Sequence, residues 1–113
     1  MDFRVEVTDR AFDEIDAIAD YIRQRGSFES AEKWLLGIEQ SLSNLSYTAG
    51  IHPAVPGSDV IGGKFHILLH GPKNRRYKIF YFIEIKRRVV HVIHVRHWAR
   101  KSPTAAEIAD LNS

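Results

Sequence analysis

The segment from Arg75 to Arg100 decides the fold: it reads RRYKIFYFIEI over residues 75–85, KRR over residues 86–88 and VVHVIHVRHWAR over residues 89–100. The two outer runs are rich in β-branched and aromatic residues, and a short basic connector separates them. This pattern is typical of an antiparallel β-hairpin. The apolar positions of the hairpin therefore predict the core, and the cationic and imidazole side chains between them predict the working surface.

The composition of the 113-residue chain indicates one domain over residues 1–113, with residues 99–113 as a short C-terminal tail. Hydrophobic residues make up 44% of the chain, which favours a packed core over disorder. The chain has no cysteine, which excludes disulfides and thiolate metal sites. The N-terminus lacks the apolar segment of a signal peptide, and no apolar run approaches the ~20 residues of a membrane span. We therefore expect a cytoplasmic protein without membrane association.

The net charge of +2 conceals an uneven distribution along the chain. Residues 1–60 carry 5 Lys/Arg and 11 Asp/Glu, a net charge of −6, whereas residues 61–113 carry 11 Lys/Arg and 3 Asp/Glu, a net charge of +8. Five of the six histidines also lie in the second half. A solvated basic sheet face and a surface for an acidic or polyanionic partner both fit this distribution.

Two amphipathic helices are predicted between residues 8 and 46, joined by a short connection at Gly26-Ser27. Thr8 can cap the first helix, and Gly26 can end it in a left-handed conformation. The first helix repeats apolar residues at Phe12, Ile15, Ala19 and Ile22, and the second at Ala31, Trp34, Leu35, Ile38, Leu42 and Leu45. We expect Gly37, inside the second helix, to permit close approach of the first. The short connection makes the two helices an antiparallel hairpin.

The remaining elements are strands separated by glycine and proline. Phe3–Val7 alternates apolar and charged residues as a half-buried strand, residues 47–63 read as a long loop, and Lys64–His70 reads as a second strand. With the hairpin of residues 75–100, the order is β-α-α-β-β-β. We therefore predict an α+β fold in which the helical hairpin packs on one face of an antiparallel sheet.

The third strand places different apolar residues on its two faces. A sheet covered by helices on one side would bury Tyr77, Ile79, Tyr81 and Ile83, and would leave the aromatic rings of Phe80 and Phe82 exposed on the other. Exposed apolar patches of that kind mark partner surfaces. We expect Phe80, Phe82, Trp98 and Arg100 to bind a partner.

The ordered segments resemble the RelE/ParE superfamily of toxins from type II toxin–antitoxin modules, and ParE-like members more closely. The resemblance rests on Ala11–Ile22, Ala31–Leu35, Leu42–Leu45, Tyr77–Tyr81 and Val92–His97. It implies a small toxin that forms a hetero-oligomer with a cognate antitoxin encoded beside it. RelE-type members cut messenger RNA in the ribosomal A site, whereas ParE-type members poison DNA gyrase.

The resemblance also indicates which residues would act in a nuclease. Lys78 stands where nuclease members carry a phosphate-holding arginine, Arg76 lies two residues earlier, and His97-Trp98 occupies the place of a proton-exchanging pair. Arg76, Lys78, Arg96 and His97 are therefore the candidate catalytic residues of a metal-independent ribonuclease. Because this set lacks a tyrosine, gyrase inhibition by protein contact is the first hypothesis. The alternatives are a ribosome-dependent mRNA endoribonuclease and an inactive, binding-only member. We expect no cofactor and no metal site.

Overall fold

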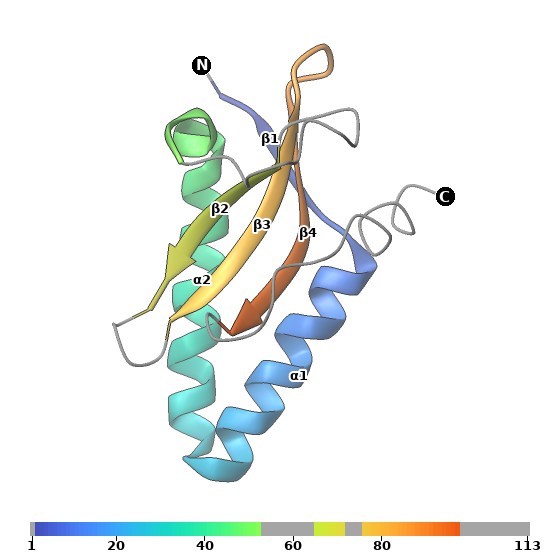
Figure 1. Ribbon diagram of the computed structural model, residues 1–113. Helices are drawn as coiled ribbons and strands as arrows, with labels where there is room; N and C mark the ends of the chain where they lie inside the picture. The colour runs from blue at the N-terminus through green and yellow to red at the C-terminus, as the bar shows by residue number, and fades with distance from the viewer. Residues whose placement is uncertain (1, 53–64, 72–75, 98–113) are drawn as a thin grey trace.

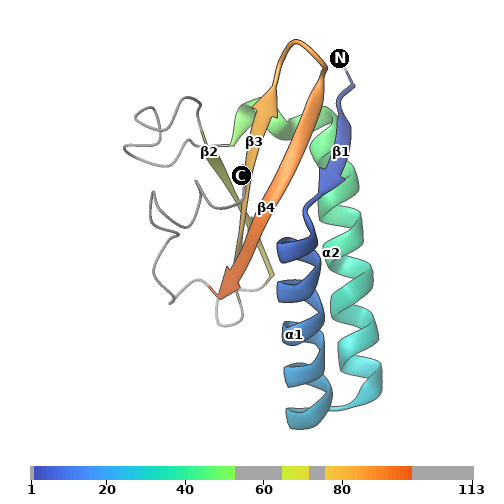
Figure 2. The ribbon, with the colours of Figure 1, turned by 90° about the vertical axis from the view of Figure 1, so that its right-hand side faces the viewer.

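The structure is a computed structural model, and it describes residues 2–52, 65–71 and 76–97. Its elements are β1 (Arg4–Val7), α1 (Asp9–Arg25), α2 (Phe28–Thr48), the 3-10 helix η1 (Ala49–Ile51), β2 (Phe65–His70), β3 (Tyr77–Glu84) and β4 (Val89–His97). Both helices lie on one face of a single sheet (Figures 1 and 2). The predicted α+β class and the order β-α-α-β-β-β are confirmed. The predicted tail, Trp98 and Arg100 lie outside the described residues.

The sheet has the strand order β1-β4-β3-β2, and it is mixed rather than wholly antiparallel. β2, β3 and β4 form antiparallel pairs, whereas β1 pairs with β4 in parallel. The reason is the connection through the helices: α1 continues away from the end of β1, and α2 returns the chain to the end where β1 began (Figure 2). The next strand therefore runs in the same direction as β1, and so does β4 after the β3–β4 hairpin.

The helix boundaries follow local capping interactions. The Thr8 hydroxyl accepts the Ala11 N–H at 3.2 Å, and the Ser27 hydroxyl accepts the Ser30 N–H at 3.0 Å. These bonds satisfy N–H groups that have no partner within their helix. Gly26 ends α1 at a φ of −118°, so the predicted left-handed stop is wrong. α2 also continues to Thr48, and η1 follows it directly. The loop that was expected over residues 47–63 therefore begins later than predicted.

The main core lies between the helices and the sheet. Tyr77, Ile79 and Tyr81 of β3 are buried in it, and Ile83 packs against it, as predicted. The helices contribute Ala11, Ile15, Ile38, Leu42 and Leu45. Phe12, which the periodicity placed on this face, is exposed, because Ala11 occupies the position against the sheet.

A smaller core lies on the opposite face of the sheet and contains Phe65, Phe80 and Ile93, with Phe82 packed against it. The expected exposure of Phe80 is therefore wrong: its side chain is 1% exposed, and Phe82 is half-buried. The β3–β4 register shifts between Phe80 and Tyr81, so that Phe80 faces His94 and Tyr81 faces Val92. The extra residue, Ile93, packs into the smaller core beside Phe80.

His70 of β2 contacts α2 at Gly37 and Ser41. Its Nδ1 is hydrogen-bonded to the Ser41 hydroxyl at 2.7 Å, and burial lowers the pKa of its imidazole. A Cβ at Gly37 would lie 3.2 Å from His70 Cε1. The glycine therefore accommodates a β2 side chain, and the expectation that it serves close approach of α1 is wrong.

Two more imidazoles surround the Tyr81 ring. His66 stacks on Tyr81 at a centroid distance of 5.3 Å and an interplanar angle of 14°, and its Nδ1–H donates to the His52 carbonyl at 2.9 Å. Burial first, and then the nearby His66, lower the pKa of His52. The Tyr81 hydroxyl donates to the Ala49 carbonyl at 2.5 Å, and burial raises its pKa. These contacts join β2 and β3 to the end of α2.

Candidate functional site

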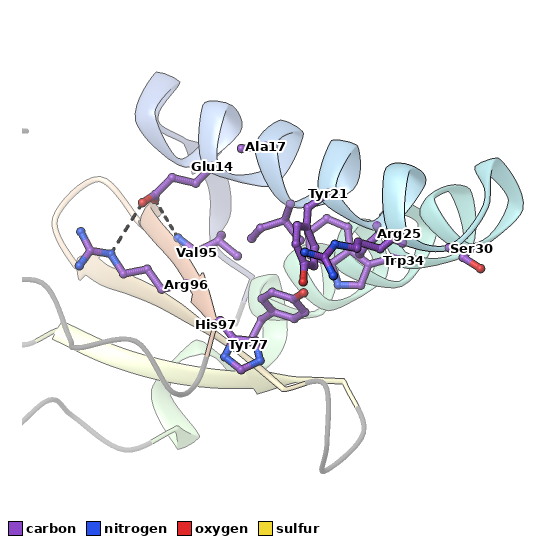
Figure 3. Close-up of a pocket in the computed structure, with 13 residues that line it drawn as sticks. Glu14, Ala17, Tyr21, Arg25, Ser30, Trp34, Tyr77, Val95, Arg96 and His97 are labelled. Atoms are coloured by element: carbon purple, nitrogen blue, oxygen red, sulfur yellow. Dashed lines mark hydrogen bonds and ion pairs between the residues drawn. The ribbon is translucent and has the colours of Figure 1, made fainter.

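A groove of about 1070 Å³ lies between the helical hairpin and the ends of β3 and β4 (Figure 3). α1 supplies one wall, the first turns of α2 supply another, and the strands close the far side. The lining residues are Glu14, Ala17, Ile18, Tyr21, Ile22, Arg25, Gly26, Ser30, Trp34, Tyr77, Val95, Arg96 and His97. The groove is thus assembled from two neighbouring helices and two strands that lie far from them in the sequence.

The aromatic side of the groove is formed by Trp34, Tyr77 and His97. The Trp34 and Tyr77 rings meet edge-on at 5.3 Å, and the Tyr77 and His97 rings meet edge-on at 5.5 Å. Trp34 Nε1 is buried, and it has no hydrogen-bond partner within the described part of the chain. Buried indole N–H groups normally have a partner. The groove therefore combines an aromatic surface with a buried indole N–H that has no partner among the described residues.

The open edge of the groove near the hairpin end carries Tyr21 and Arg25. Tyr21 is 56% exposed, and the Arg25 guanidinium carbon lies 5.3 Å from the centroid of its ring. The two residues are four positions apart, which places them on neighbouring turns of one helix face. Over residues 2–52, 65–71 and 76–97, no carboxylate forms an ion pair with Arg25. This edge of the groove is therefore aromatic and cationic.

At the other end of the groove, Glu14 connects α1 to β4. Glu14 Oε1 accepts the Val95 backbone N–H at 3.0 Å and lies 3.0 Å from His94 Nδ1, while Glu14 Oε2 lies 3.7 Å from Arg96 Nε. β1 covers the edge of β4 only from Val89 to Val92. Glu14 thus accepts a hydrogen bond from a backbone N–H on the uncovered part of that edge. Without Glu14, an additional strand could bind to this N–H.

Two of the four candidate nuclease residues, Arg96 and His97, line the groove. Lys78 is the cross-strand neighbour of Arg96, and Tyr77 is that of His97. Arg96 is 7% exposed and lies beside Glu14. Arg76 is half-buried immediately before β3. Their proposed catalytic role stays a prediction.

Two of the predicted partner-binding residues, Phe80 and Phe82, are less exposed than expected, and the other two lie outside the described residues. Phe80 belongs to the smaller core, and Phe82 meets the Phe65 ring edge-on at 5.5 Å. Among the described residues, the exposed phenylalanine and tyrosine rings lie on the helices, at positions that include Tyr21 and Phe28. Sequence periodicity missed the groove because its residues come together only after the hairpin packs on the sheet.

No group of three or more His, Asp or Glu side chains that could hold a metal ion occurs in the described segments. No helix in those segments is long and apolar enough to cross a bilayer.

The two-helix hairpin over one face of a four-stranded sheet, with a groove between them, defines the class as a small α+β protein. The family model for the ParE toxin of the type II toxin–antitoxin system parDE matches residues 5–101. The chain belongs to this family of ParE toxins, and membership in a toxin–antitoxin system implies a cognate antitoxin partner.

The structural comparison agrees with this fold. A solved structure titled the chromosomal ParDE TA system from P. aeruginosa contains a chain with a TM-score of 0.62 and 15% sequence identity. The match covers 84% of this chain and 95% of that chain. A search of curated proteins gave no match.

Proposed function

We propose that this chain inhibits DNA gyrase by protein–protein contact, and that its cognate antitoxin neutralises it by laying a peptide segment in the groove. Membership in the ParE toxin family supports the first part. The observation that carries the second part is the buried Trp34 indole N–H, which has no acceptor among the described residues. A bound peptide would supply that acceptor through a main-chain carbonyl or a polar side chain.

The lining of the groove specifies the chemistry of the bound segment. An apolar side chain would pack against the rings of Trp34 and Tyr77, where it displaces water from aromatic surface. A carboxylate on the same segment would pair with Arg25 at the open edge. This combination fits an acidic amphipathic segment, a common form of peptide that binds hydrophobic grooves.

Supercoiling of relaxed plasmid by purified gyrase tests the proposed target. Micromolar excess of the toxin should inhibit supercoiling, and prior addition of the antitoxin should restore it. Unchanged supercoiling at that excess would rule out gyrase as the target. An antitoxin that restores supercoiling without binding the toxin would contradict neutralisation by direct contact.

The ribonuclease alternative has one observation in its favour, the cross-strand pair of Lys78 and Arg96. A metal-free nuclease also needs an acid or base within reach of these cations. His97 lines the groove together with Arg96, but Arg96 is 7% exposed and lies beside Glu14, which leaves its guanidinium little access to a phosphate and favours the gyrase proposal. Toeprinting of translating ribosomes would detect A-site cuts that are lost in Lys78→Ala and His97→Ala.

An inactive, binding-only member is the remaining alternative. Expression of the toxin without its antitoxin tests it directly, because an active toxin arrests growth. Sustained growth with folded toxin present would favour the binding-only alternative over both active forms.

A further inference from the structure

The closed end of the helical hairpin projects past the ends of the strands in two perpendicular views (Figures 1 and 2). We use "hairpin tip" for Tyr21, Arg23, Arg25 and Phe28, which lie on the last turns of α1 and the first turn of α2. Tyr21 is 56% exposed and Phe28 is 63% exposed. Neither ring contributes to the buried clusters of the core.

Each exposed ring of the hairpin tip lies against an arginine. The Arg25 guanidinium carbon is 5.3 Å from the Tyr21 ring centroid, and that of Arg23 is 5.7 Å from the Phe28 ring centroid. Both distances fall within the range of cation–π attraction, which strengthens when water is removed. The rings hold the guanidinium groups in place. The N–H groups at the edges of each guanidinium can still donate to another molecule.

The backbone of the hairpin tip is fixed by capping bonds. The Gly26 N–H donates to the Ile22 carbonyl at 2.7 Å, and the Ser27 hydroxyl caps α2 at the Ser30 N–H. A partner would therefore meet side chains on a fixed backbone and would lose less conformational entropy on binding. Tyr and Arg are also the residue types that most often dominate binding energy at protein interfaces.

The charges at the hairpin tip favour a carboxylate-bearing protein over a nucleic acid. Residues 21–28 contain two arginines and no acidic residue. Arg23 pairs with Asp20 at 2.5 Å, whereas no carboxylate of the described residues pairs with Arg25. Asp20 and Glu29 flank the tip and would repel the continuous negative charge of a phosphate backbone. A single carboxylate can reach Arg25 without meeting them.

We infer that the hairpin tip is the surface with which the toxin contacts an acidic patch on its target protein, and that a peptide in the groove blocks this contact. The inference rests on the proposed function and adds the location of the target surface. Tyr21 and Arg25 belong both to the groove and to the tip. Antitoxin and target would therefore compete for the same two side chains.

The test uses full-length toxin, purified gyrase and the antitoxin encoded beside the toxin gene. Arg23→Glu/Phe28→Ala changes two residues that do not line the groove. Arg10→Glu/Tyr47→Ala is the matched control, because it removes the same kinds of side chain at exposed positions away from the tip. Thermal unfolding confirms that each variant is folded, and the single variant Phe28→Ala replaces the double variant if that one fails to fold.

We expect Arg23→Glu/Phe28→Ala to bind and inhibit gyrase about tenfold or more weakly than wild type, as loss of interface anchors does. Its affinity for the antitoxin and the activity of the control pair should stay within about twofold of wild type. A preformed toxin–antitoxin complex should not bind gyrase.

Three results would overturn the inference. Inhibition by the tip variant at wild-type strength would show that the tip is dispensable while leaving the proposed function intact. Gyrase binding by the preformed toxin–antitoxin complex would exclude competition. If the wild-type toxin bound plasmid DNA in the absence of gyrase and the tip variant did not, the tip would be a surface that binds nucleic acid. Wild-type toxin without any effect on gyrase would instead remove the proposed function, and this inference with it.

Discussion

Glu14 on α1 accepts the backbone N–H of Val95 at 3.0 Å, at a point on β4 that β1 no longer covers. The same carboxylate lies within 3.0 Å of His94 Nδ1 and 3.7 Å of Arg96 Nε. One side chain thus links the first helix to the last strand, at one end of the groove that lies between these elements.

Glu14→Ala should destabilise the protein by about 2–3 kcal/mol, because it leaves the Val95 N–H and the His94 imidazole without their acceptor. Glu14→Gln keeps one acceptor oxygen and should cost about 1 kcal/mol. Urea unfolding measures both values. Asp13→Ala, at the exposed neighbouring position, is the control and should change stability little. Equal stability of Glu14→Ala and Asp13→Ala would contradict a bridging role for Glu14.

Gly37→Ala tests the contact between α2 and β2. Alanine gains about 1 kcal/mol over glycine in a helix, but its Cβ would lie 3.2 Å from His70 Cε1. We expect this gain in the free energy of unfolding to appear in full only when His70 is also replaced by alanine. Free energies of unfolding for both single variants and the double variant give the coupling directly. Additive effects of the two substitutions would show that Gly37 does not serve this contact.

The protein should lose stability on acidification below pH 6.5. Burial lowers the pKa of His52 and His70 in the folded state below 6.5, the ordinary value of a histidine side chain. The unfolded chain therefore binds more protons, so the free energy of unfolding falls as pH drops through 6.5 towards the folded pKa values. Urea unfolding between pH 8 and pH 5 measures this slope.

His70→Gln tests whether His70 causes part of this pH dependence of stability. It removes one of the two imidazoles and should flatten the slope between pH 7 and pH 5. A wild-type slope in His70→Gln would assign the pH dependence to other groups.

Trp34→Phe should weaken antitoxin binding by about three- to tenfold, because it removes the indole N–H that the bound peptide is proposed to satisfy. Phenylalanine keeps an aromatic ring beside Tyr77. The N–H has no acceptor in the described residues, so its removal should not cost a hydrogen bond in the free toxin. Titration calorimetry against the antitoxin measures the affinity, with Tyr47→Phe as an exposed aromatic control. Unchanged affinity would place the peptide elsewhere.

Local sequence patterns were sufficient to predict the helices, the strands and the side chains on the face of the sheet that the helices cover. Thr8 and Ser27 cap the helices through bonds to residues three positions away, and Tyr77, Ile79 and Tyr81 alternate towards the helices. Each of these features depends on neighbours along one helix or one strand. The sequence could therefore establish the α+β class and the order of the elements.

Contacts between distant segments decided the rest. The strand register and the irregularity at Ile93 place Phe80 in a second core, although alternation alone predicts an exposed ring. Similarly, Glu14 meets Val95 across 81 positions of sequence, and the aromatic groove exists only where helix and strand ends converge. The amino-acid sequence by itself determined which segments become helices and strands, because local spacing and capping control those choices. Only the tertiary structure determined which side chains remain available to a partner, because availability depends on register and packing between segments far apart in the chain.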